Sequence, residues 1–376
     1  MTDPTIALLK DLVAIDSVNP SLVPGGAGEG AIAERLAAEL RAARIDVQIA
    51  EAAPGRPNVF GVIDGGRPGP SLMLCGHSDT VGVEGMAAPF DPVVRDGKLF
   101  GRGAQDMKGG VASILGAARR LASSPGGLVG RVIVAIVADE EYASIGADAA
   151  VREWKADAAI VTEPTDLTIG IGHKGFEWVE VETSGIAAHG SRPDDGVDAI
   201  LMMGRVLAEL DALERAFIAG RPHPLLGRPS LHASLIAGGR ELSTYPDRCA
   251  LSVERRTVTG EEPGRLVGEV EAILARQRSA DPRFRASARA TFERPPYLTP
   301  EGHPLPRLLR ESLGRETTVG AMSFWTDAAI LGGAGMASVV FGPGGAGLHG
   351  VEEYVRLDEV LACREALVEV ARRFCA

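Results

Sequence analysis

The chain has no long apolar run and no run of basic residues. Its longest apolar stretches, such as Val132 to Ala138, have the length of a strand and fall far short of the ~20 residues that a membrane helix needs. With 39 basic and 50 acidic side chains the formal net charge is −11, and a surface of that sign repels phosphate backbones. These absences argue against a membrane-spanning segment and against a nucleic-acid partner.

Cysteine is scarce, and a leader segment is not apparent. The four cysteines are scattered without CxxC spacing: Cys75, Cys249, Cys363 and Cys375. This pattern favours reduced thiols over disulfides or a zinc knuckle. The N-terminal stretch MTDPTIALLKDLVAI lacks a basic region and is interrupted by Lys10 and Asp11, so it predicts an amphipathic helix and not a signal peptide. A cytoplasmic protein is therefore expected.

The length of 376 residues predicts two domains. In the first part of the chain, helix-like and strand-like patterns alternate, and RVIVAIVAD is a continuous apolar run of the kind that fills a buried strand. Such alternation is typical of an α/β sheet that is largely parallel. We expect a three-layer α/β domain around a mostly parallel sheet, made of residues 1–173 and 294–376.

The pattern changes after Gly172. Two alternating stretches, Phe176–Glu182 and Phe284–Phe292, enclose two helical patterns and two further strands. The resulting order, βαββαβ, is that of the split ferredoxin-like arrangement. An inserted α+β domain is therefore expected over residues 174–293.

A histidine and an aspartate, His77 and Asp79, follow a predicted strand in LMLCGHSDTV. Open α/β sheets bind their ligands at the carboxyl ends of strands. At this spacing the aspartate can accept the second N–H of the imidazole and leave the other nitrogen for a metal. A solvated pair of polar residues is the alternative.

Acidic residues recur at similar places. Asp106, in GRGAQDMKGG, precedes a Gly/Ala-rich helix, where a simple N-cap is the alternative. Glu140 and Glu141 end the apolar strand in VADEEYA, and like charges at a buried strand end are costly unless a cation or a proton compensates them. Glu163, in VTEPTD, follows another apolar strand. These carboxylates indicate a cation site at one edge of the sheet.

A second histidine, His349, ends the Gly-rich loop of FGPGGAGLHGVEE. Two histidines and several carboxylates without a thiolate suit zinc, cobalt or manganese. One aspartate can give an oxygen to each of two ions, about 3.5–4 Å apart in such sites.

The motifs GHSDTV, GRGAQDMKGG, DEE, TEP and GLHG resemble, in order and spacing, the metallohydrolase family that includes acetylornithine deacetylase, succinyl-diaminopimelate desuccinylase, aminoacylase and glutamate carboxypeptidase. The likeness runs from IDSVNP to HGVEEYV. It implies two divalent metal ions, with zinc as the first choice and cobalt or manganese as alternatives. The implied ligands are Asp106 bridging both ions, His77 and Glu163 on one, and Glu141 and His349 on the other.

The resemblance also implies catalytic roles. Glu140 is the expected general acid/base, which takes a proton from a metal-bridging water and passes it to the leaving amine, while the resulting hydroxide attacks the amide carbonyl. Asp79 is expected to orient His77. His189, in GIAAHGSRPDDG, resembles the residue that stabilises the oxyanion, often from the partner subunit of a dimer. From the residues alone, His189 would be a turn residue beside Gly190.

Two substrate contacts are implied as well. Arg256, in LSVERRTVTG, resembles the arginine that grips the substrate α-carboxylate, and a solvated basic pair with Arg255 is the alternative. Backbone N–H groups of the Gly-rich loop, at Gly342 and Gly344, can bind the same carboxylate, or the loop is a plain turn.

These expectations converge on a metal-dependent amidohydrolase that removes an acyl group from a small N-acyl amino acid, as acetylornithine deacetylase does. A metallocarboxypeptidase or dipeptidase with the same centre is the alternative. A non-catalytic binder is disfavoured, because every expected ligand and Glu140 are present.

The substrate and the assembly are less determined. Ser243 and Thr244, in ELSTYPDR, stand where the family often has asparagine, so the acyl group and the amino acid stay open. A homodimer is expected, since the sheet of a βαββαβ domain can pair edge to edge with its copy.

Overall fold

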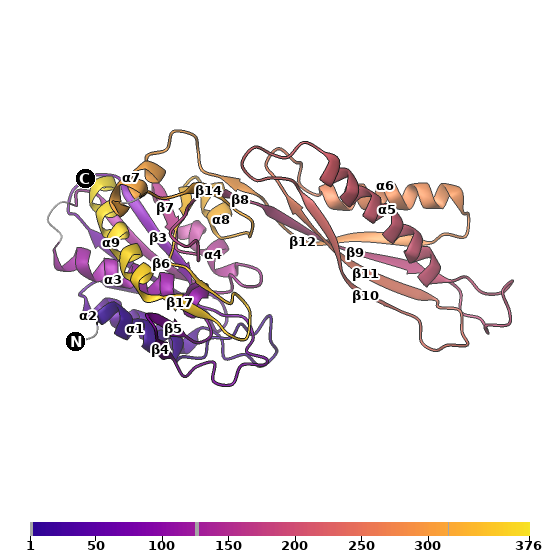
Figure 1. Ribbon diagram of the computed structural model, residues 1–376, viewed down its shortest axis with the longest axis horizontal. Helices are drawn as coiled ribbons and strands as arrows, with labels where there is room; N and C mark the ends of the chain where they lie inside the picture. The colour runs from indigo at the N-terminus through magenta and orange to yellow at the C-terminus, as the bar shows by residue number, and fades with distance from the viewer. Residues whose placement is uncertain (1–2, 125–127, 315) are drawn as a thin grey trace. The chain divides into compact units, whose positions relative to one another are not determined.

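The computed structural model describes residues 3–124, 128–314 and 316–376, and the chain divides into two compact units (Figure 1). The first unit comprises Met1–Gly172, Thr299–Met322 and Thr326–Ala376, and the second comprises His173–Leu298 with Ser323–Trp325. The expected N-terminal helix is α1, which begins at Pro4; residues 1–2 of that stretch lie outside the described residues. No helix in the described part of the chain combines the length and apolar character of a membrane span.

A large sheet forms the centre of the first unit. Its strands lie in the order β1 (Asp46–Ala53), β2 (Arg56–Asp64), β6 (Arg131–Val137), β3 (Ser71–His77), β7 (Ala158–Val161), β15 (Ala337–Val340) and β8 (Ile169–His173), and β14 (Val319–Met322) also pairs with β8. The four central strands β6, β3, β7 and β15 are parallel to one another, whereas β2 pairs antiparallel with β1 and β6, and β8 pairs antiparallel with β15. The predicted α/β class is confirmed, with a sheet that is parallel at its centre and antiparallel at its flanks.

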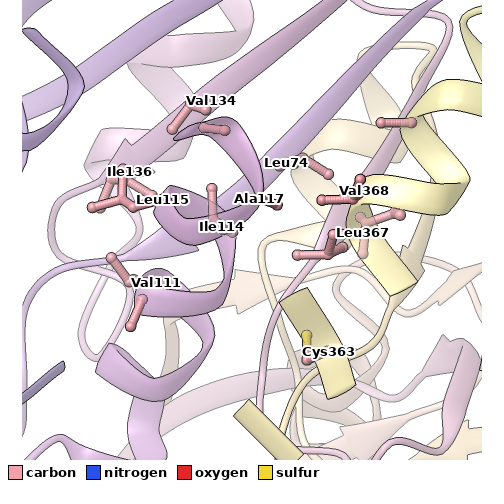
Figure 2. Packing of buried hydrophobic residues seen from close by; sticks show 14 of the residues in the cluster. Leu74, Val111, Ile114, Leu115, Ala117, Val134, Ile136, Cys363, Leu367 and Val368 are labelled. Atoms are coloured by element: carbon pink, nitrogen blue, oxygen red, sulfur yellow. The ribbon is translucent and has the colours of Figure 1, made fainter. Parts of the chain in front are cut away.

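Helices cover both faces of this sheet. They are α1 (Pro4–Val13), α2 (Gly30–Ala42), α3 (Gly109–Ser123), α4 (Ile145–Glu153), α7 (Pro304–Leu313), α8 (Ala328–Gly333) and α9 (Leu357–Phe374). Helices α3 and α9 pack together and contact β3, while α4 packs on α8 and β6. Figure 2 shows Leu74, Val134 and Ile136 of the sheet among residues of α3 and α9. Helices cover both faces of the sheet at β3 and β6, so the side chains on both sides of these strands are buried. Their sequences are therefore continuous apolar runs.

The second unit has the element order β9 (Gly175–Ser184), α5 (Ala199–Ala219), β10 (Ser230–Gly238), β11 (Arg248–Thr257), α6 (Arg265–Ala280) and β12 (Ala286–Arg294), followed by β13 (Tyr297–Leu298). Its antiparallel sheet has the order β10-β11-β9-β12, and α5 and α6 lie on one face (Figure 1). Val179 and Val181 of β9 are buried in the core with these helices, whereas Glu180 is exposed and Glu182 half-buried. This alternation is what a sheet with one covered face requires.

A small sheet belongs to the first unit and joins distant parts of the sequence. Its strands are β16 (Gly345–Ala346), β17 (Tyr354–Arg356), β5 (Lys98–Phe100) and β4 (Val93–Arg95), in that order. A short π-helical turn, Ala104–Lys108, follows β5 and leads into α3. The pairing of β17 with β5 thus connects the Gly-rich loop near the C-terminus to the turn before α3.

Candidate metal centre

The main sheet assembles one part of the site. His77 ends β3, Glu163 follows β7, and the pair Glu140–Glu141 follows β6. Since β6, β3 and β7 are parallel neighbours, their carboxyl ends meet at the same edge of the sheet. The structure thus brings together residues that lie far apart in the sequence.

Asp106 is positioned by the turn between β5 and α3. Gly103 in this turn has φ 77°, and a Cβ on Gly110 would come within 2.2 Å of the carbonyl oxygen of Thr162, so both places require glycine. The interpretation of Asp106 as a helix cap is wrong, because Lys108 occupies the N-cap position of α3.

His349 reaches the site from the loop between β16 and β17, where its own backbone is left-handed, with φ 58°. The loop is held by Glu353, which is 1% exposed. The Glu353 carboxylate accepts hydrogen bonds from the backbone N–H groups of Gly103, Gln105 and Asp106 at 3.0, 2.8 and 3.1 Å, and it pairs with Arg102 at 2.7 Å. Sequence reasoning missed Glu353, because nothing in HGVEEY marks the second glutamate as buried.

The side chains form two clusters that share Asp106. Its Oδ1 lies 3.2 Å from His77 Nε2, and its Oδ2 lies 3.4 Å from His349 Nε2. Glu163 Oε1 lies 3.8 Å from His77 Nε2, and Glu141 Oε2 lies 3.1 Å from His349 Nε2. In each cluster the ligand atoms lie within 4.8 Å of one another. The buried cluster comprises His77, Asp106 and Glu163, and the exposed cluster comprises Asp106, Glu141 and His349.

Asp79 lies beneath this arrangement and is fully buried. Its two carboxylate oxygens accept the backbone N–H groups of Glu140 and Glu141 at 3.1 and 3.2 Å. His77 Nδ1 lies 3.1 Å from the backbone carbonyl oxygen of Asp79 and 3.5 Å from its Oδ1. The carbonyl is thus the nearer acceptor, and it leaves Nε2 to face the cluster. Glu140 Oε2 lies 3.9 Å from that Nε2.

The protonation of the site reflects crowded carboxylates. Burial and the charge of Asp106 raise the pKa of Glu141 to about 7, and burial raises the pKa of Glu140 and Glu163 well above the usual value. Asp327 is a buried carboxylate that the sequence analysis did not identify. Its charge further raises the pKa of Glu140 and of Glu163. Hydrogen bonds to Asp106 and Glu141 raise the pKa of His349 to about 10.

The residues fit a pair of divalent cations. In the described part of the chain, Glu141 Oε1 and Glu163 Oε1 are buried without a hydrogen-bond partner. Buried carboxylate oxygens in that state are costly, and a cation in each cluster would compensate them. Two imidazoles and three carboxylates without a thiolate form a donor set that suits zinc, cobalt or manganese.

The Gly-rich loop does not offer the two expected donors. The N–H of Gly342 is donated to Thr165 Oγ1 at 3.1 Å, and the N–H of Gly344 to Glu359 Oε2 at 2.8 Å. Each residue has only one such donor, so the expectation that these amides bind a substrate carboxylate is not supported. Close packing explains the glycines, since a Cβ at Gly342 would lie 2.3 Å from the carbonyl oxygen of Thr162.

The other two expected functional residues lie in the second unit. His189 is exposed, and its Nδ1 lies 2.8 Å from Ser191 Oγ. Arg256 donates from Nε to Glu254 at 2.6 Å, and its guanidinium lies 5.4 Å from the centre of the Phe176 ring. Arg255, in contrast, is fully buried, so the two arginines do not form a solvated pair.

The mixed α/β fold and the paired clusters of imidazole and carboxylate define a metal-binding hydrolase. Residues 73–373 match the peptidase family M20/M25/M40, and the chain belongs to this family. It is 32% identical to an acetylornithine deacetylase of Myxococcus xanthus, over 81% of this chain and 80% of that protein. It is 28% identical to the N-formyl-4-amino-5-aminomethyl-2-methylpyrimidine deformylase of Bacillus subtilis, over 99% of this chain and 94% of that protein.

Solved structures share the fold. An M20-family metallo-carboxypeptidase of Sulfolobus solfataricus is 16% identical with a TM-score of 0.82, and all of both chains is covered. A dinuclear metal-binding peptidase of Bacillus subtilis is 17% identical with a TM-score of 0.76, over 98% of this chain and 97% of that chain. The resemblance inferred from the sequence is confirmed, and the chain is a hydrolase that acts on amide bonds.

Proposed function

We propose that this chain removes the acyl group from small N-acyl amino acids, with one divalent metal ion in each of the two clusters. The observation that carries the proposal is the position of Asp106, which directs one carboxylate oxygen toward each of two histidines. Both sequence relatives named above, the deacetylase and the deformylase, are named for removing an acyl group. This favours the deacylase over the carboxypeptidase or dipeptidase alternative.

In this proposal, His77 and Glu163 would hold one ion, Glu141 and His349 would hold the other, and Asp106 would contribute to both sites. Zinc is the first choice for the native metal, and cobalt and manganese suit the same donor set. Two ions here would polarise the amide carbonyl and acidify a water molecule.

Glu140 is the proposed proton carrier, because it lies beside the buried cluster without belonging to either set of ligands. It takes the proton of the attacking water and returns it to the nitrogen of the leaving amine. Burial raises its pKa well above the usual value, which suits a carboxyl that must hold a proton between two steps.

We further propose that the inserted domain of residues 174–293, which makes up most of the second unit, acts as a lid and as a dimerisation domain. His189 is the proposed donor to the oxyanion, and Arg256 the proposed partner of the substrate carboxylate. The hydrogen bond to Glu254 and the contact with Phe176 would hold the Arg256 guanidinium in one orientation.

A homodimer is proposed through β10. This strand lies at an edge of its sheet, and its apolar residues Leu235 and Ile236 are 72% and 56% exposed. An exposed apolar edge favours pairing with a second strand. Sedimentation of the native chain should give a dimer, and Ile236→Lys should shift it toward the monomer; a fully active monomeric native chain would contradict this assignment.

The experiment that tests the function is amine release by protein loaded with zinc, cobalt or manganese. The substrates are N-acetyl, N-formyl, N-succinyl and longer N-acyl amino acids beside dipeptides. Turnover concentrated in the acyl amino acids supports the proposal and identifies the acyl group. Turnover confined to dipeptides would refute the deacylase proposal and support the dipeptidase or carboxypeptidase alternative.

A further inference from the structure

A buried ionic network lies behind the turn that carries Glu140 and Glu141. Arg56, at the start of β2, donates from Nε and Nη2 to the two carboxylate oxygens of Glu29, each at 2.7 Å. The same Nη2 donates to Asp139 Oδ1 at 2.8 Å. Glu29 and Asp139 are 0% and 1% exposed, and Arg56 is 7% exposed. A planar guanidinium is the only side chain that can serve both carboxylates in this fork geometry.

Asn19 extends the network to the metal centre. Its Nδ2 donates to Asp79 Oδ2 at 2.7 Å and to Asp139 Oδ1 at 3.0 Å, so one amide group bridges two buried carboxylates. Its Oδ1 accepts the backbone N–H of Ser21 at 2.8 Å. An aspartate here would add a third negative charge, and a leucine would leave both carboxylates without this donor.

The network acts on the backbone of the catalytic turn. Asp79 accepts the N–H groups of Glu140 and Glu141, and the N–H of Asp139 is donated to Glu29 Oε1 at 3.2 Å. Asp139 itself has φ 67°, a conformation that residues with a side chain rarely adopt. Three consecutive amides of this turn are therefore held by carboxylates, which Arg56 and Asn19 in turn hold in place.

We propose that Arg56 and Asn19 are positioning residues that fix the directions of Glu140 and Glu141 through Asp79 and Asp139. This inference rests on the function proposed above, in which Glu140 carries the proton and Glu141 binds an ion. A buried ion pair is weak evidence for stability, because apolar residues of similar volume often stabilise a fold as well. The geometry gives the Arg56–Glu29 pair a positioning role, because both residues form hydrogen bonds with Asp139 in the turn that carries Glu140 and Glu141.

The test compares Asn19→Leu and Arg56→Lys with Arg35→Lys. Arg35 also pairs with two carboxylates, Asp11 and Glu39, but it lies on α2 and neither partner belongs to the centre, so it is the matched control. In the two network variants we expect kcat to fall roughly 10- to 100-fold, with a smaller change in KM. The affinity for zinc, measured by chelator competition, should fall by a similar factor for one of the two ions. Arg35→Lys should match the wild type in all three quantities.

A readout that needs no metal separates the network from the function. Amide hydrogen exchange at Glu140 and Glu141 should be at least about tenfold faster in Asn19→Leu than in the wild type, since a lost hydrogen bond to a charged group is worth that much. Equal exchange rates in Asn19→Leu and the wild type would overturn the inference. A variant with a lower melting temperature but unchanged kcat and zinc affinity would also overturn it. A wild-type chain that binds no zinc and hydrolyses nothing would instead refute the proposed function, while the exchange comparison still decides on the network.

If Arg56→Lys does not fold, the double variant Arg56→Met with Glu29→Leu replaces the ion pair by apolar side chains. It removes the Arg56 donor to Asp139 and the Glu29 acceptor of the Asp139 N–H, keeps the Asn19 donor, and leaves the volume filled. The inference expects low kcat in this folded variant as well, and a wild-type kcat would contradict it.

Discussion

The two ligand clusters share Asp106 but are built by different parts of the fold. His77 is held at the end of a central strand with its side chain 1% exposed, whereas His349 stands on a loop with its side chain 55% exposed. The imidazole of the buried cluster is therefore held by the packed sheet, whereas the imidazole of the exposed cluster depends on the position of the loop. We expect the ion of the exposed cluster to bind more weakly and to exchange faster.

Asp106→Asn removes the feature that the clusters have in common, and it should have the largest effect. The amide has only one oxygen, so it cannot give an oxygen to each ion. Since polarisation by metal ions is worth several kcal/mol, kcat/KM should fall more than about a thousandfold. Equilibrium dialysis should show fewer than two ions per chain. A variant that retains both ions and wild-type kcat/KM would refute the bridging role.

Glu140→Gln changes neither cluster and should leave both ions bound. Glutamine keeps the size of the side chain but cannot carry the proton, so kcat should fall at least about a hundredfold. Metal content and turnover are measured on the same preparation. Wild-type turnover in this variant would refute the role of Glu140, and loss of an ion would make it a ligand instead.

His349→Ala and His77→Ala separate the clusters directly. We expect His349→Ala to keep one ion and a nearly unchanged melting temperature, because the side chain lies largely in solvent. His77→Ala opens a cavity at the end of β3 and should also lower stability by roughly 2 kcal/mol or more. Calorimetric zinc titration and thermal unfolding measure the two effects. Equal loss of stability in both variants would contradict the difference between the clusters.

The buried cluster is also the part that the sequence predicts best. His77 ends the apolar strand β3 and Glu163 follows the apolar strand β7, and the parallel pairing of these two strands brings their ends together. The residues that support the site carry no comparable pattern. Arg56 and Asp139 meet across 83 positions and Glu353 and Gly103 across 250, so only the folded chain shows that they are partners.

The Gly-rich loop shows a second limit of sequence reasoning. Its glycines suggested free backbone donors, but close packing against backbone atoms requires Gly342, and the N–H groups of both Gly342 and Gly344 are donated within the protein. Glycine is compatible with both interpretations, and the side chains that decide between them, Thr165 and Glu359, lie 177 and 15 positions away from the glycines they bind. The antiparallel flanks of the main sheet were missed for a related reason, because apolar runs reveal strands but not their directions.

The pH dependence of zinc binding should give the smallest effect, and it concerns the exposed cluster. The pKa of His349 is raised to about 10 by its hydrogen bonds to Asp106 and Glu141, and the pKa of Glu141 is raised to about 7. An ion binds only the neutral imidazole and the ionised carboxylate, so between pH 7 and 9 it must displace the proton of His349. Affinity should therefore rise about tenfold per pH unit in this range, and more steeply below pH 7, where Glu141 is also protonated. Calorimetric titrations in two buffers of different ionisation enthalpy count the protons released. Release of none at pH 8 would show that the His349 imidazole carries no proton there before the ion binds, and it would refute this pH dependence.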